Sequence, residues 1–94
     1  RELWEAELPD SELRSAQRFA ASATLRITPL DDCLQPAEES FAVVLRDISE
    51  KGLSFIHTRA ITNRFVLVEF ATRESAAPRL LAHVVRCQPV RLFY

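Results

Sequence analysis

Two arginines four residues apart, Arg14 and Arg18, have the side chains in this sequence best suited to holding an anion. All 12 basic residues except Lys51 are arginines, and arginine suits planar, bidentate recognition of phosphates and guanine edges. A separation of four residues places both side chains on one face of a helix or of a strand. The pair therefore predicts a fork of positive charge, although a solvated helix face carries the same pattern.

A second polar group lies between two apolar segments, from Asp47 to Gly52. Gly52 is the only glycine, whereas average usage of about 7% would supply roughly six or seven in this length. We expect Gly52 to supply a positive φ where the chain reverses tightly. Asp47 and Ser49 are expected to accept bonds from nearby backbone amides. Taken alone, this stretch predicts a hairpin turn.

The residues around the arginine pair show an apolar spacing closer to helical than to alternating, carried by Leu3, Trp4, Leu8 and Leu13. Pro9 interrupts this spacing. Asp10 or Ser11 is suited to cap a short helix that begins at Glu12. We therefore expect a lead-in segment of one or two short helices, with Trp4 and Leu8 packed loosely on the rest of the molecule.

After residue 19 the pattern changes to a period of two, which is typical of half-buried strands. Six short strands are expected, at residues 23–28, 41–45, 53–57, 65–70, 80–87 and 91–94. Strands of this spacing predict an all-β fold, a small antiparallel barrel or sandwich. We place the lead-in segment at residues 1–19 and the β-domain at residues 20–94, with a last strand that is incomplete at Tyr94.

Length and composition exclude several classes of protein. The 94 residues, 48% of them hydrophobic, suffice for one core, because domains usually run to about 100–150 residues. The 12 basic and 13 acidic residues nearly cancel, so no global field attracts a nucleic acid polymer or an anionic membrane. The aromatic content of 9% also argues against a groove for single-stranded nucleic acid. No apolar run approaches the roughly 18 residues of a membrane span.

The residue types that support catalysis or metal binding are scattered. Cys33 and Cys87 lie far apart, without a C-x-x-C motif or a nearby histidine pair, which argues against zinc and for a reduced, cytoplasmic setting. His57 and His83 stand alone in their segments, and no nucleophile elbow surrounds Ser49. We therefore expect neither a metal centre nor an enzyme.

Considered together, the two polar motifs are more informative than either alone. R-x-x-x-R at Arg14–Arg18, followed by D-x-S-x-x-G at Asp47–Gly52, resembles the signature of the PilZ domain family. In that family the arginine pair precedes the first barrel strand, and the second motif lies between the second and third strands. The stretch Gly52–His57 is similar to the third strand of the family, and Val84–Arg86 to the penultimate one. The resemblance covers residues 14–94.

The resemblance implies a six-stranded antiparallel β-barrel that binds cyclic di-GMP and needs no other cofactor. In that interpretation Arg14 and Arg18 hold guanine edges and phosphates. Asp47 and Ser49 would bond a guanine edge or phosphate from the barrel, and Gly52 would let the turn come close.

The resemblance also implies a signalling role. The lead-in segment would become ordered on the barrel when the ligand bridges the two, and would pass the signal to an output domain or partner protein. Members often carry a further arginine before the first of the pair, where this sequence has Leu13, so the electropositive patch is smaller. The alternative is a degenerate PilZ domain that binds protein instead of nucleotide.

Overall fold

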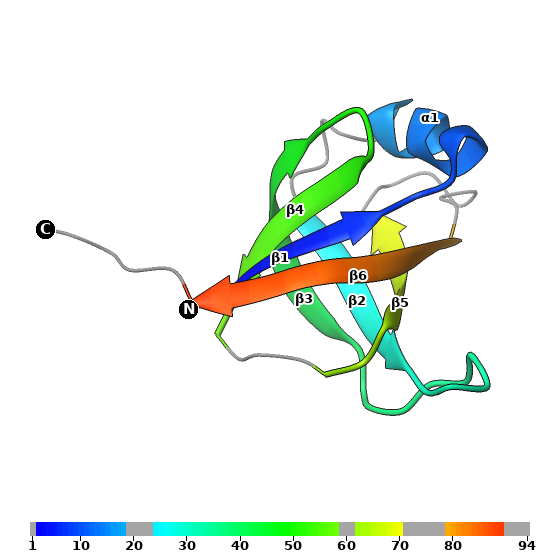
Figure 1. Cartoon of the computed structure of the whole chain (residues 1–94), viewed down its shortest axis with the longest axis vertical. Coiled ribbons are helices and arrows are strands. Elements are labelled where there is room, and N and C mark those ends of the chain that lie inside the picture. The colour runs from blue at the N-terminus through cyan, green and yellow to red at the C-terminus, as the bar shows by residue number, and fades with distance from the viewer. Residues whose placement is uncertain (1, 19–23, 59–61, 71–78, 90–94) are drawn as a thin grey trace, which may run out of the picture.

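The computed structural model describes residues 2–18, 24–58, 62–70 and 79–89, and within the helix it leaves out the side chains of Ser15 and Arg18. These residues form six strands and one helix (Figure 1). In chain order the elements are β1 (Glu2–Glu7), α1 (Asp10–Arg18), β2 (Thr24–Leu30), β3 (Phe41–Ile48), β4 (Gly52–His57), β5 (Phe65–Phe70) and β6 (Arg79–Pro89).

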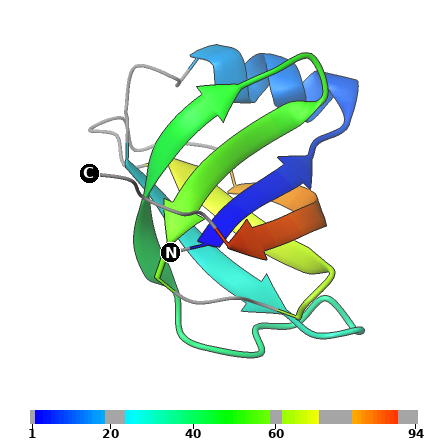
Figure 2. The ribbon, with the colours of Figure 1, turned by 60° about the vertical axis from the view of Figure 1, so that its left-hand side comes forward.

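The strands form a closed antiparallel barrel in the order β1-β4-β3-β2-β5-β6, with β6 returning to pair with β1 (Figures 1 and 2). The expected six-stranded barrel is thus confirmed, and four of the expected strands correspond to β2, β3, β4 and β5. The expected strand at residues 80–87 is also present, within the longer β6. The strand expected at residues 91–94 lies outside the described residues.

The first strand corrects the expectation of a helical start. Glu2–Glu7 form β1, which pairs with β4 on one side and with β6 on the other. Trp4 and Ala6 of β1 are buried in the core, while Glu5 and Glu7, the residues that follow each of them, lie on the outer face. This strand therefore closes the barrel, and the expectation that Trp4 packs loosely was wrong.

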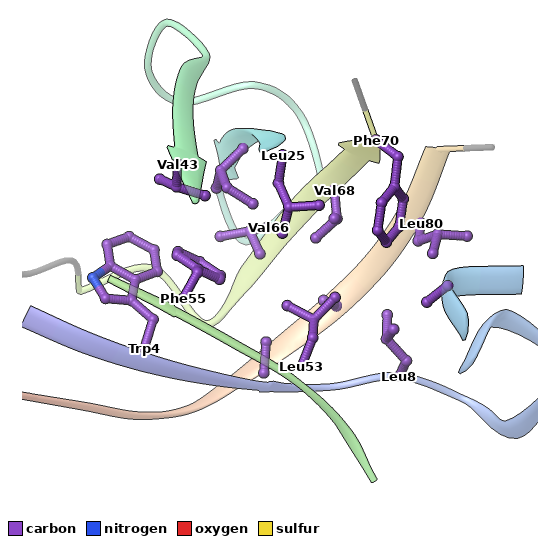
Figure 3. Close-up of a cluster of buried hydrophobic side chains, with 14 of the residues drawn as sticks. Trp4, Leu8, Leu25, Val43, Leu53, Phe55, Val66, Val68, Phe70 and Leu80 are labelled. Carbon is purple, nitrogen blue, oxygen red and sulfur yellow. The ribbon is translucent and has the colours of Figure 1, made fainter. Parts of the chain in front are cut away.

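The core fills the inside of the barrel with side chains from every strand (Figure 3). Trp4 is completely buried, with its ring centroid 5.1 Å from that of Phe55. Figure 3 shows these two rings at one end of the cluster and Leu8 at the other. Aromatic contacts of this kind add about 0.5–1.5 kcal/mol beyond the burial of area. Trp4 thus ties β1 to β4 from within the core.

Helix α1 packs against one end of the barrel. Its first intrahelical bond runs from the Leu13 amide to the Pro9 carbonyl, at 2.8 Å, so the helix begins at Asp10 and not at Glu12 as expected. Leu8 before the helix and Leu13 in its second turn are both buried in the same core cluster, which is the arrangement of a hydrophobic staple. The staple sets the direction in which α1 leaves β1.

A polar loop joins β2 to β3, as expected. The Asp31 carboxylate accepts bonds from the amides of Cys33 and Gln35, at 2.8 and 3.0 Å. Leu34 in the same loop has a φ of 61°. Among the described residues, no helix is long and apolar enough to cross a membrane.

Candidate functional site

The turn between β3 and β4 is stabilised by its own polar groups. The Ser49 amide donates to the Gly52 carbonyl at 2.8 Å, and the Ser49 hydroxyl accepts from the Lys51 amide at 3.4 Å. Asp47, two residues earlier, lies at the end of β3 opposite Ser54. The hairpin turn expected from the sequence is therefore present, and Ser49 holds it as predicted.

Gly52 has a different reason for being glycine than the one expected. No glycine among the described residues has a positive φ. Instead, a Cβ atom at Gly52 would overlap the carbonyl oxygen of Ala6 and approach the Cα of Glu7 to 2.9 Å. The absence of a side chain thus allows β1 to lie directly against the start of β4. The expectation of a positive φ was wrong, and close backbone approach replaces it.

A groove of about 620 Å³ lies on the outer face of the barrel beside this turn. This volume falls within the range of about 300–1,000 Å³ that is usual for small-molecule sites. Its lining includes three of the five predicted site residues. The described residues that line it are Glu5, Ala6, Glu7, Arg46, Asp47, Ser49, Lys51, Gly52, Leu53, Ser54 and Val85.

Two irregularities in strand pairing flank this groove. In β3 the register shifts between Leu45 and Asp47, which leaves Arg46 as an extra residue opposite β4. In β6 the partners of Glu5 and Ala6 are Arg86 and Val84, which leaves Val85 unpaired with β1. Bulges bend a strand and redirect its side chains, and both extra residues line the groove. The sheet is therefore irregular on both sides of the β1–β4 pair.

The arginine pair belongs to helix α1. Arg14 is an exposed residue of α1 outside the described lining of the groove, and Arg18 is the last residue of that helix, with its side chain outside the described part of the structure. The helix starts beside the turn, because the Leu8 amide donates to the Lys51 carbonyl at 3.1 Å. Both views show α1 and the β3–β4 turn at the same end of the barrel (Figures 1 and 2).

The charges of the groove do not by themselves suit a phosphate. Among the residues described there, the lining has the carboxylates of Glu5, Glu7 and Asp47 and the cations of Arg46 and Lys51. Carboxylates accept hydrogen bonds and repel anions, so they suit a ligand group that donates. A phosphate in this groove would need cations beyond those of its described lining.

Sequence reasoning missed the contribution of β1 to the groove. Glu5 and Glu7 alternate with the buried residues Trp4, Ala6 and Leu8, a period of two that was readable as a half-buried strand. Arg46, which belongs to neither sequence motif, also lines the groove. The pairing of β1 with β4 is what brings these side chains beside Asp47.

The histidines and cysteines do not form a second site in the part of the chain that the structure describes. His57 is half-buried with its ring centroid 4.2 Å from that of Phe41, and His83 is exposed beside Phe65 at 5.1 Å. Cys33 and Cys87 are free thiols. No cluster of three or more possible metal ligands occurs among the described residues.

Comparison with known proteins adds no relative to this description. The chain matches no protein-family model, no curated protein and no solved structure.

Proposed function

We propose that this chain is a PilZ-like sensor domain that binds cyclic di-GMP and passes the signal to an output partner. The observation that supports the proposal is that helix α1 and the turn between β3 and β4 lie at the same end of the barrel (Figures 1 and 2). Asp47, Ser49 and Gly52 line a groove of ligand size, and the helix that carries Arg14 and Arg18 starts at the adjoining turn.

The chemistry of the ligand suits a site with cations on α1 and hydrogen-bond acceptors in the groove. Cyclic di-GMP is a compact dianion with two guanine bases. Arg14 and Arg18 on α1 supply guanidinium groups that bond phosphate oxygens, or guanine O6 and N7, in a bidentate manner. Asp47 and Ser49 supply acceptors, and a hydroxyl donor, from the groove. Both kinds of ligand group thus have a complementary partner.

The proposed signal is a change in how firmly α1 is held on the barrel. Leu13 and Ala16 bury their side chains against the core, so undocking α1 exposes them. Burying a leucine contributes about 1.5–3 kcal/mol. A free-energy difference of this size between the docked and undocked states is small enough for ligand binding to shift the equilibrium. A ligand that bridges α1 and the turn favours the docked state.

The proposal is tested by calorimetric titration of cyclic di-GMP, with GTP and cyclic GMP as controls. We expect selective binding, and a loss of at least about 1 kcal/mol of affinity in each of Arg14→Ala and Arg18→Ala, because each substitution removes a charged hydrogen bond. Arg64→Ala is the matched control, since Arg64 is exposed and precedes β5. Unchanged affinity in both helix variants would contradict the proposed roles.

A second candidate function is protein binding by a degenerate PilZ-like domain. It is supported by an apolar strip on the outer face of β3 and β4, where Val44 is 64% exposed beside Ala42 and the half-buried Ile56. Exposed apolar patches mark interaction surfaces in many soluble proteins. A chain that shows no heat with cyclic di-GMP would favour this candidate over nucleotide sensing.

A further inference from the structure

Four polar residues form a row across neighbouring strands on the outer face of the barrel. Asp47 of β3 lies opposite Ser54 of β4, Ser54 lies opposite Glu5 of β1, and Glu5 lies opposite Arg86 of β6. Directly opposite residues in an antiparallel pair have Cβ atoms about 4.5–5.5 Å apart. Glu5 thus stands at the centre of the row, between a hydroxyl and a guanidinium group.

The groove along this row has three carboxylates in its described lining, and Arg86 stands opposite Glu5 at its edge. Next to these carboxylates a phosphate has no favourable partner, because they accept hydrogen bonds and donate none. A guanine base is different, because its Watson–Crick edge presents the donors N1–H and N2–H₂ side by side. A carboxylate accepts both of these bonds at once. The charge distribution favours a base in the groove and the phosphates toward the arginines of α1.

We propose that Glu5 is the residue that selects guanine, by accepting hydrogen bonds from the N1–H and N2–H₂ groups of one base of the ligand. This inference rests on the proposed binding of cyclic di-GMP. Adenine has an acceptor at N1 and no donor at C2, so it would leave the Glu5 carboxylate unpaired. The same residue therefore explains both affinity for guanine and rejection of adenine.

Glu5 is better placed for this role than the neighbouring Glu7. Glu5 is half-buried, whereas Glu7 is exposed at the end of β1. Glu7 also lies opposite Gly52 and His83, so no hydroxyl or guanidinium group flanks it in the register. Partial burial strengthens a charged hydrogen bond and holds the carboxylate in one orientation.

The decisive experiment compares Glu5→Gln with Glu7→Gln in titrations with cyclic di-GMP and cyclic di-AMP. Each change removes one negative charge from the same groove, so electrostatics alone would make both variants bind the dianion more tightly. If Glu5 selects the base, Glu5→Gln should instead lower the affinity for cyclic di-GMP. We expect Glu5→Gln to weaken the binding of cyclic di-GMP by about tenfold or more. The preference of the domain for cyclic di-GMP over cyclic di-AMP should fall by a similar factor. Glu7→Gln should bind as tightly as the wild type or more so.

A third variant separates the position of the carboxylate from its charge. Glu5→Asp keeps the charge but withdraws the carboxylate by one methylene, and we expect it also to lose affinity about tenfold. Thermal unfolding checks that each variant is folded. Equal tightening in Glu5→Gln and Glu7→Gln would overturn the role of Glu5 while leaving the binding function intact. Failure of the wild-type chain to bind cyclic di-GMP would overturn the proposed function itself.

Discussion

At Gly52 the close approach of strands β1 and β4 restricts the residue type to glycine. The Ala6 carbonyl occupies the space that a Cβ atom would need, so glycine is required by the neighbouring strand and not by the turn. The same residue lines the groove beside Asp47 and Ser49. The position that lets β1 close the barrel is therefore also the floor of the candidate site.

We expect Gly52→Ala to lower the free energy of unfolding by about 1–3 kcal/mol, because inserting a methyl group here forces backbone atoms to shift. Urea unfolding followed by tryptophan fluorescence measures the change, since Trp4 is the only tryptophan. Lys51→Ala, at the exposed neighbouring position, should stay within about 0.5 kcal/mol. Equal stability of the two variants would show that β1 does not press against β4.

Strand β1 connects several parts of the fold. It pairs with β4 on one edge and with β6 on the other, it carries Trp4 into the core, and it leads into α1 through Leu8. An open sheet would expose unpaired backbone groups at two edges. Loss of β1 would therefore open the barrel and displace the helix with the arginine pair.

We expect Trp4→Ala to destabilise the domain by about 3–5 kcal/mol, the range for truncating a large buried aromatic side chain. That loss is a large fraction of the roughly 5–15 kcal/mol that holds a typical domain folded. Differential scanning calorimetry measures it. Val44→Ala on the outer face of β3 is the control, because Val44 is 64% exposed. A small effect at Trp4 would contradict the role of β1 in closing the core.

At the scale of the whole molecule, charge is balanced overall and uneven locally. The formal net charge is -1, so no long-range field draws in a dianion. Helix α1 carries Arg14 and Arg18, while three carboxylates line the groove in the described part of the chain. If the chain binds a phosphate as proposed, the attraction would act over about 8 Å, the Debye length under physiological salt.

We expect salt to weaken cyclic di-GMP binding mainly by speeding its dissociation. Between about 0.05 M and about 0.5 M salt, the association rate should change by less than about threefold, because screening removes little long-range steering from a nearly neutral domain. Stopped-flow measurements across a salt series give both rates. A steep fall in the association rate, with an unchanged dissociation rate, would contradict the local character of the attraction.

Much of the fold and part of the site could be predicted from the sequence. Alternation from residue 24 onward predicts five of the six strands because the polar and apolar sides of a half-buried strand repeat every two residues. The stretch from Asp47 to Gly52 predicts the hairpin turn, since Ser49 bonds its own backbone. These features depend on residues close in sequence, so local chemistry is enough to determine them.

Only the tertiary structure decided how β1 is used. A short segment such as Glu2–Glu7 has apolar residues that fit a helical or a strand period, and the free edges of β4 and β6 select the strand. The reason for Gly52, the placement of Glu5 beside Ser54, and the meeting of α1 with the turn all follow from that pairing. Each depends on contacts between residues far apart in the chain, which no local pattern encodes.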